Sequence, residues 1–373
     1  MSMKIMSNTL PLRFVALLST QSAILPMGGG PLDKPYHFHI LTDYISKPTL
    51  DALNALVATL SEIYPCKLST HTIDDSIFQG SRPWGFEYES VKSYSAYYRL
   101  LVARILPRDA TKCLYLDSDM LVLCDVRELF ALDLGTHILA SNCGYTTKEA
   151  KWDRTLKSRD SGRVQTFEVP YYFCSGLMLI NLTQWRNGDI ESKCLDCFVK
   201  YELEFPDQDA LNVVVKGNLL VLPAEYGLLI FQAGIELNNP KCNFKGDLRA
   251  ALQKLKIAHF NGPSHPWLSK YNYLDSNALA IDYPYIDEWW SVAFETPIFC
   301  DELRMVYDKI HSDTHIIHAS LHSFAIHIAK IDELMSLNDK VQKIAEKQSP
   351  LKYYTKKWGK SIKKRLRKLG FMC

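Results

Sequence analysis

The first third of the chain alternates apolar runs of strand length with amphipathic segments of helix length. The expected elements are, in order, strand 13–18, strand 36–42, helix 47–63, strand 67–72, helix 93–106 and strand 114–116. Strands that follow one another through helices favour an α/β sheet with parallel strands. Ligands of such sheets bind beyond the carboxyl ends of the strands, so we expect the catalytic and ligand-binding side chains there.

Two carboxylates stand directly after the last of these strands, in the sequence Asp117-Ser118-Asp119. Carboxylates are costly to bury without a partner. A pair separated by one residue at a strand end can point to one side and hold a hard divalent cation through oxygen. This Asp-x-Asp pattern is typical of enzymes that bind a nucleotide diphosphate through a metal. A short acidic turn between two strands is the alternative interpretation.

The composition indicates a globular protein with an uneven distribution of charge. The 373 residues are 47% hydrophobic and 23% charged, with a net charge of +2. Residues 351–373 contain nine Lys or Arg and no acid, so the rest of the chain carries about −7. The close pair Cys194 and Cys197 has no second pair to complete a zinc site, and free cysteines suit a reducing cytosol. No run of 18 apolar residues exists, so no transmembrane helix is expected.

The remainder of the chain predicts further strands and helices around a polar segment. Residues 144–169 are rich in charge and are interpreted as a long loop with some helix over the site. The other expected elements are strand 136–140, the buried run 177–180, helix 182–205, helix 207–215, strand 256–260 and the mostly helical segment 297–347.

Four motifs follow one another in a characteristic order: Asp117-x-Asp119, Ser175-Gly176, Asp207-Gln208-Asp209 and His259-x-x-Gly262. Residues 36–267 resemble glycosyltransferase family 8 in these motifs and in the sequences around them. These sequences are FHILTD, LYLDSDMLV, SGLMLINLTQW, DQDALN and HFNGPSHPW. These enzymes are retaining sugar transferases of the GT-A type, typified by bacterial galactosyl- and glucosyltransferases of lipopolysaccharide cores. The resemblance implies a GT-A-like domain with a mixed, mainly parallel sheet.

The resemblance also assigns roles to individual residues. It implies metal ligation by Asp117, Asp119 and His259, usually of Mn²⁺ with Mg²⁺ as the other choice. It implies that Asp207 binds sugar hydroxyls and that Gln208 lies at the anomeric carbon, as nucleophile or as stabiliser of a front-face attack. The residues implied to bind the donor are Arg99, Asp117, Ser118, Ser175, Gly176, Gly262 and His265.

The sequence departs from the family pattern in three places. The family opens with a strand followed by an Asp-x-x-Tyr turn that holds uracil and ribose, but residues 18–25 contain neither Asp nor Tyr. Either the nucleoside is held differently or residues 1 to about 34 are altered relative to a working enzyme. His265 replaces the usual lysine, and Cys174 stands where an Asn usually contacts the donor.

The basic tail interleaves its charges with apolar residues at helical spacing, which is typical of a helix at a membrane surface. The alternatives are a solvated tail and a nucleic-acid patch, and no base-reading motif supports the latter. We therefore expect a catalytic domain over 1–275, a helical region over 276–349 and a membrane-associating tail over 350–373.

The sequence-based hypothesis is a hexosyltransferase in the cytoplasm, peripheral to the inner membrane. It would move glucose or galactose from UDP-glucose or UDP-galactose to a lipid-linked saccharide of the lipopolysaccharide core or a related glycan. It would bind the anionic inner leaflet through the tail, and no nucleic acid. A catalytically impaired member that binds membranes or glycans is the first alternative. A toxin that glycosylates host proteins is the second.

Overall fold

The structure, a computed structural model, describes most of the chain. The described residues are 15–19, 36–79, 81, 83, 93–143, 152–239, 241–242, 244–267, 283–312, 331, 334–338, 340 and 359–365. The chain forms two compact units, Met1–Leu268 with Asp282–Asp308, and Ser269–Ile281 with Lys309–Cys373. Among the described helices, none has both the length and the apolar content that crossing a bilayer requires.

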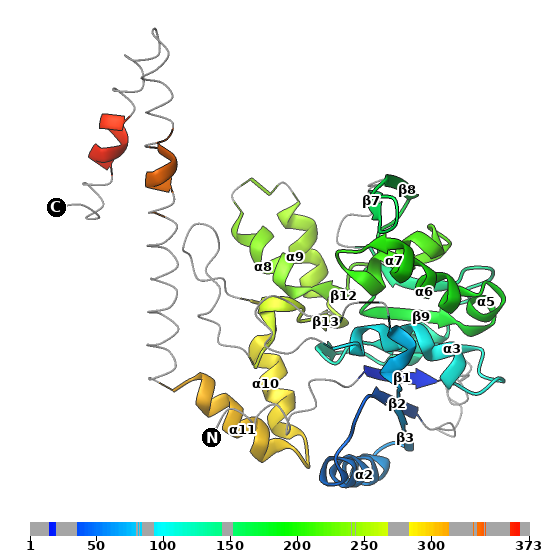
Figure 1. Ribbon diagram of the computed structural model, residues 1–373. Coiled ribbons are helices and arrows are strands. Elements are labelled where there is room, and N and C mark those ends of the chain that lie inside the picture. Colours follow the sequence, from blue (N-terminus) through cyan, green and yellow to red (C-terminus); the bar gives the residue numbers. More distant parts are fainter. Residues whose placement is uncertain are drawn as a thin grey trace. The chain divides into compact units, whose positions relative to one another are not determined.

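A seven-stranded sheet forms the centre of the first unit, in the order β11-β6-β9-β4-β1-β2-β3 (Figure 1). Its strands are β1 (Val15–Ser19), β2 (Tyr36–Thr42), β3 (Cys66–Thr72), β4 (Lys112–Leu116), β6 (Leu139–Asn142), β9 (Leu177–Asn181) and β11 (Leu219–Leu222). Six of these strands were predicted to within a few residues, whereas β11 was not predicted.

The directions of the strands add a detail to the predicted mixed sheet. The sheet is mixed, as expected, but only the pairs β2–β3 and β6–β11 are parallel. The other four neighbouring pairs are antiparallel. The other five strands all run in one direction, and β1 and β9 are inserted between them in the opposite direction. The alternation of strands and helices in the sequence does not reveal these reversals.

Two smaller sheets complete the strand content of the described residues. One contains β10 (Tyr201–Glu202), β7 (Trp152–Ser158) and β8 (Val164–Val169), and the other contains β12 (Tyr226–Leu229), β13 (Ile257–His259) and β5 (Met120–Val122). The β7–β8 hairpin overturns the expectation of a loop with some helix over 144–169. Six residue pairs align across it, and Gly162 adopts the positive φ of +65° in its turn. Residues 144–151 of that expected loop lie outside the described residues.

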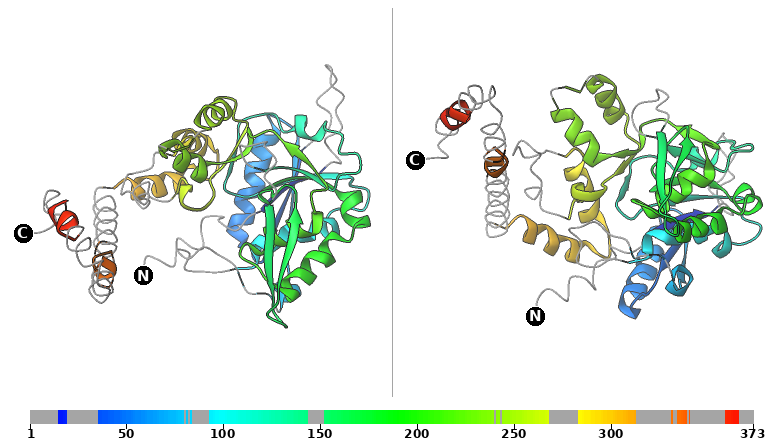
Figure 2. Two further views of the ribbon diagram at one scale, coloured as in Figure 1. Left: turned by 90° about the horizontal axis from the view of Figure 1, so that it is seen from above. Right: turned by 45° about the horizontal axis from the view of Figure 1, so that its top comes forward.

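Figure 2 shows the helices of the described residues from two further directions. They are α2 (Lys47–Ser61), α3 (Val102–Ile105), α4 (Arg127–Phe130), α5 (Leu182–Asn187), α6 (Ile190–Lys200), α7 (Pro206–Val215), α8 (Ile230–Asn238), α9 (Lys245–Gln253), α10 (Ile286–Glu295) and α11 (Cys300–Ile310). Short 3₁₀ segments cover Asp75–Phe78, Ser95–Leu101 and Gly262–Ser264. The expected helix 93–106 is thus mostly a 3₁₀ segment, and helix 182–205 breaks at Asp189, which has a φ of +51°.

Both faces of the central sheet are buried in apolar clusters. In β4, Cys113 and Tyr115 belong to one cluster, whereas Leu114 and Leu116 belong to the other. This division follows the two-residue period of a strand, whose successive side chains point to opposite faces. A strand covered on both faces reads as a continuous apolar run. The first polar residue after it, Asp117, therefore marks the point where the chain leaves the core.

The second unit is described only in short helical pieces. Helical residues occur at 331, 334–338 and 340, and again at 359–365 within the basic tail. Residues 360–365 are exposed, including the apolar Ile362 at 38%. The other members of the expected apolar stripe, Trp358, Leu366 and Leu369, lie outside the described residues. The boundaries at 275 and 349 stay predictions.

Candidate functional site

Three side chains that could bind a metal ion converge where β4 ends, β5 begins and β13 ends. β13 pairs antiparallel with β5 in a register that sets His259 opposite Met120. In addition, the Phe260 N–H donates to the Asp119 carbonyl at 2.9 Å. This backbone pairing brings His259 to the acidic turn, and one ligand atom each of Asp117, Asp119 and His259 lies within 4.8 Å of the others.

The donor atoms of this cluster fit a divalent cation. His259 Nε2 lies 3.2 Å from Asp119 Oδ1 and 3.8 Å from Asp117 Oδ2. Asp119 Oδ1 is buried and, apart from this ion-pair contact with His259, has no hydrogen bond from the described residues, which is costly unless a cation satisfies it. Burial opposes the charge of Asp119, but His259 and His265 hold the pKa of this carboxyl well below its usual range. Two carboxylates and an imidazole suit Mn²⁺ or a similar ion.

Asp117, Asp119 and His259 form what we call the metal half of the site. Arg99 connects this metal half to a second group of polar side chains. It lies in the buried 3₁₀ segment and donates from Nη2 to Asp117 at 2.8 Å and from Nη1 to Ser175 Oγ at 2.8 Å. Its Nε is 3.1 Å from Asp207 Oδ2. Burial raises the pKa of Asp207, and the Arg99 guanidinium opposes that rise. The predicted donor and catalytic residues therefore share one buried charge network.

Asp207 and Gln208 open α7 and face the turn that follows residue 173. The Ser175 hydroxyl donates to Asp207 Oδ2 at 2.9 Å, and the Ser175 N–H donates to Gln208 Oε1 at 3.1 Å. Pro206 occupies the first turn of the helix, where its missing N–H costs nothing. One residue, Ser175, thus binds Arg99 and both predicted catalytic residues.

Asp209 makes different contacts from those of Asp207 and Gln208. It is fully buried, accepts from the Tyr172 hydroxyl at 2.6 Å and pairs with Arg154 Nε at 2.8 Å. The N–H groups of Glu204 and Phe205 also donate to it. It therefore fixes the entrance of α7 to the β7–β8 hairpin. Sequence reasoning missed Arg154 and Tyr172, since the hairpin that carries Arg154 was not predicted.

The remaining predicted donor residues surround the metal half. Gly176 is buried and accepts from the Asp117 N–H at 2.8 Å. Gly262 has a φ of +59°, a conformation that favours glycine. His265 Nε2 lies 3.1 Å from Asp119 Oδ2, and its ring stacks on Trp267. Ser118 is exposed between the two aspartates.

The carboxyl end of β1 lies away from this group of side chains. β1 runs against β4, pairing Ala16 with Leu116 and Ser19 with Cys113. The chain consequently leaves β1 beside the start of β4, whereas Asp117 follows the end of β4. Apart from Leu18 and Ser19, the sequence segment 18–25, where the family has its nucleoside-binding turn, lies outside the described residues.

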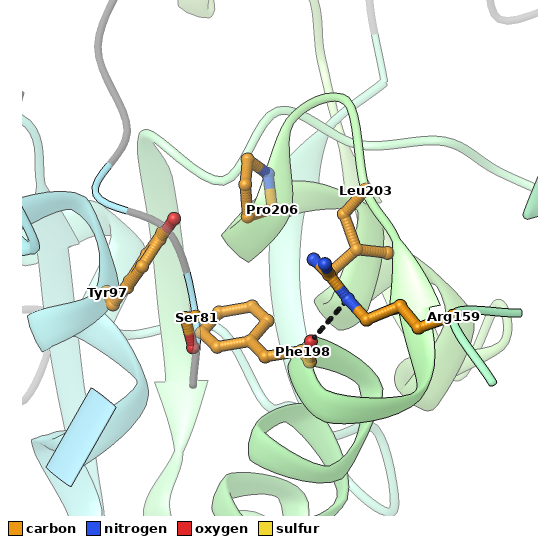
Figure 3. Close-up of a pocket in the computed structure, with 6 residues that line it drawn as sticks. All are labelled: Ser81, Tyr97, Arg159, Phe198, Leu203 and Pro206. Atoms are coloured by element: carbon orange, nitrogen blue, oxygen red, sulfur yellow. Dashed lines mark hydrogen bonds between the residues drawn. The ribbon is translucent and has the colours of Figure 1, made fainter. Parts of the chain in front are cut away.

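A small cavity lies beneath the start of α7 and is distinct from the metal half (Figure 3). It is lined by Ser81, Tyr97, Arg159, Phe198, Leu203 and Pro206. Its volume of about 10 Å³ suits roughly one water molecule. Arg159 Nε donates to the Phe198 carbonyl at 3.1 Å beside it, so this cavity is a packing feature and not a substrate site.

Comparison with known proteins identifies the family. The family model described as glycosyl transferase family 8 matches residues 3–271. A lipopolysaccharide 1,2-glucosyltransferase of Escherichia coli is 24% identical over 74% of this chain and 76% of its own length. A lipopolysaccharide 1,3-galactosyltransferase of Salmonella typhimurium is 22% identical over 64% of this chain and 65% of its own length.

Among solved structures, the bifunctional glycosyltransferase WbbM superimposes with a TM-score of 0.56 at 20% identity. The match covers 74% of this chain and 47% of the WbbM chain. This likeness concerns the fold alone and confirms the GT-A-like architecture. The family match over most of the sequence shows that the chain belongs to glycosyl transferase family 8 and is a glycosyltransferase.

Proposed function

We propose that this glycosyltransferase moves glucose or galactose from a UDP-sugar to a lipopolysaccharide core or a related glycan, with retention at the anomeric carbon. The names of the Escherichia coli and Salmonella typhimurium relatives support this substrate class. The observation that carries the proposal is the Arg99 network, which joins Asp117 to Asp207 and Ser175 in one site. Such a site can hold a diphosphate and a sugar side by side.

In this proposal Asp117, Asp119 and His259 hold Mn²⁺, or Mg²⁺ in its place. A bound divalent ion stabilises the negative charge that develops on the departing nucleotide diphosphate. Asp207 accepts hydrogen bonds from sugar hydroxyls. Its carboxyl group is already buried without substrate, and this burial raises its pKa. Gln208, which the Ser175 N–H orients, would face the reacting carbon of the sugar.

A donor assay tests the proposal. Purified protein with Mn²⁺ and UDP-glucose or UDP-galactose is expected to release UDP and to glycosylate a core oligosaccharide, detected by mass spectrometry. Asp119→Ala should abolish transfer, because it removes one carboxylate of the metal group. Lys157→Met, on the exposed side of the hairpin, is the matched control and should keep full activity. Full activity in Asp119→Ala would remove the metal assignment.

A second candidate function is supported by the direction of β1. If residues 1–34 do not build the nucleoside turn, the protein could bind a membrane or a glycan without transferring sugar. Calorimetric titration with UDP and Mn²⁺ separates the two functions. Binding favours the transferase, whereas the absence of heat at saturating Mn²⁺ favours the impaired member.

We further propose that the enzyme works on the cytoplasmic face of the inner membrane, attached through residues 350–373. The basic residues and the helical segment 359–365 support this location. A lipid-linked saccharide acceptor would lie at the same surface.

A further inference from the structure

The three residues Cys174, Ser175 and Gly176 each contact a different part of the site. Ser175 binds Arg99 and Asp207, while the Gly176 backbone accepts from Asp117. Cys174 reaches the third metal-site residue: its Sγ lies 3.6 Å from Nδ1 of His259. The proposed chemistry so far uses Ser175 and Gly176 and leaves the Cys174 thiol without a role.

The two ring nitrogens of His259 face different partners. Nε2 points to the carboxylates of Asp117 and Asp119, so it is the atom able to bind a cation. A neutral imidazole that offers the lone pair of Nε2 carries its proton on Nδ1, and that proton needs an acceptor. Metal-bound histidines usually donate this second N–H to a carboxylate, a carbonyl or water. Here the neighbour of Nδ1 is the sulfur of Cys174.

The backbone of Cys174 is held in place by the end of β6. Its N–H donates to the Asn142 carbonyl at 3.1 Å, and its carbonyl accepts from the Ser141 hydroxyl at 3.0 Å. Ser141 is fully buried, and its single hydroxyl proton is shared between this carbonyl and that of Leu177 at 2.7 Å. The sulfur is therefore presented from a fixed backbone, while His259 comes from β13 in another sheet.

We propose that Cys174 is a positioning residue for the metal. Its sulfur accepts the Nδ1–H of His259 and thereby turns Nε2 toward the two aspartates. The inference rests on the metal site of the proposed function but not on sugar transfer. It gives a role to the position at which this sequence departs from the asparagine of its family.

Titration with Mn²⁺ alone, without nucleotide, tests the inference by calorimetry. Cys174→Ala should weaken Mn²⁺ binding about 10-fold, the lower end of the usual effect of losing such a partner. Cys174→Ser keeps an acceptor and should restore most of the affinity. Cys143→Ala, which removes another half-buried thiol just after β6, is the matched control and should leave the affinity unchanged. Wild-type affinity in Cys174→Ala would overturn the inference.

A second measurement uses the unaltered chain, so it does not depend on how the variants fold. The rate of alkylation of each cysteine by iodoacetamide is followed by mass spectrometry with and without Mn²⁺. Mn²⁺ should slow alkylation of Cys174 several-fold and leave that of Cys66, on β3, unchanged. An unchanged rate at Cys174 in saturating Mn²⁺ contradicts the inference.

The outcomes separate this inference from the proposed function. Mn²⁺ binding that depends on Cys174, in a protein that transfers no sugar, supports the inference and overturns the function. Sugar transfer by a protein whose Mn²⁺ affinity is independent of Cys174 supports the proposed function and overturns the inference. A wild-type chain that binds no Mn²⁺ overturns the metal site and the inference together.

Discussion

Gly176 leaves space that two metal-site side chains occupy. A Cβ atom built on it would lie 2.4 Å from Cε1 of His259 and 2.7 Å from Oδ2 of Asp117. Both distances are shorter than real contacts between such atoms, so either the glycine backbone or the two ligands would have to move. The absence of a side chain here determines the geometry of the metal half.

Gly176→Ala should therefore reduce sugar transfer about 100-fold, since a displacement near 1 Å has that effect on a positioned site. Steady-state rates at several Mn²⁺ concentrations measure the loss. Gly246→Ala, in helix α9, is the control, because nothing lies within 4 Å of its added Cβ. That variant should keep full activity and gain up to about 1 kcal/mol of stability. Equal activities in the two variants would contradict the steric argument.

At the scale of elements, the β7–β8 hairpin is attached to α7 by a buried ion pair. The Asp209 side chain is completely buried, and its Arg154 partner is 25% exposed. On the same strand, Lys157 pairs with Glu202, but both side chains are 53% exposed. The two pairs have similar lengths, 2.8 and 3.0 Å, and differ mainly in burial.

Arg154→Met should lower the free energy of unfolding by about 3 kcal/mol, because it leaves the Asp209 charge buried without its cation. Lys157→Met should change it by less than about 1 kcal/mol, as is usual for exposed pairs. Urea denaturation at neutral pH measures both. Similar losses in the two variants would show that the burial of Asp209 does not decide the effect.

β2 and β3 carry three neighbouring histidines whose protonation opposes folding. His39 Nδ1 lies 3.0 Å from His71 Nε2, and the rings of His37 and His39 are 4.0 Å apart. Burial, followed by the charges of His37 and His71, lowers the pKa of His39 to about 3. Burial also lowers the pKa values of His37 and His71.

The unfolded chain therefore binds protons near pH 6.5, where folded His39 stays neutral. The stability contributed by the neutral cluster is complete above that pH and is lost as the pH falls toward 3. Between pH 7 and pH 5 the expected loss from His39 alone is about 2 kcal/mol. Urea denaturation at both pH values measures it. His39→Gln should show a smaller difference between the two pH values, and an equal difference would exclude His39 as the cause.

These elements show what the sequence could and could not predict. β4 was predictable because it is buried on both faces and reads as one apolar run, and its end located Asp117 and Asp119. The strand that carries His259 was also predicted, but the role of His259 beside the two acids followed only from the family resemblance, since a single histidine at a strand end carries little signal of its own. The β7–β8 hairpin was missed because its exposed faces are charged and only a few residues, such as Leu156, are buried. Strand direction, as in β1, depends on distant pairing that a local pattern does not contain.

On the scale of the whole molecule, charge is divided between a mildly acidic main part and a basic tail. The part of the tail that the structure describes is helical, and its Lys360, Lys363 and Lys364 are exposed. Each basic residue near an anionic leaflet contributes about 1 kcal/mol to binding. The tail is therefore expected to supply most of the affinity for such a surface.

Replacing Lys360, Lys363 and Lys364 by Gln should weaken binding to vesicles containing phosphatidylserine about 100-fold. Co-sedimentation measures the partition. The matched control replaces three exposed lysines of the first unit, Lys47, Lys193 and Lys254, and should leave binding unchanged. Equal weakening by both sets would indicate a general charge effect and would contradict a specific role of the tail.

The pairing of β13 with β5 brings His259 beside acids that precede it by 140 and 142 residues in the sequence. An unfolded chain cannot present these ligands together, so a cation bound by all three selects the folded state by mass action. At 100 times its dissociation constant, free Mn²⁺ should add about 2.7 kcal/mol to the free energy of unfolding. Calorimetric melting temperatures should rise with the logarithm of Mn²⁺ concentration, and Asp119→Ala should abolish that dependence. Thermal stability thus becomes a readout of cation occupancy that requires neither donor nor acceptor.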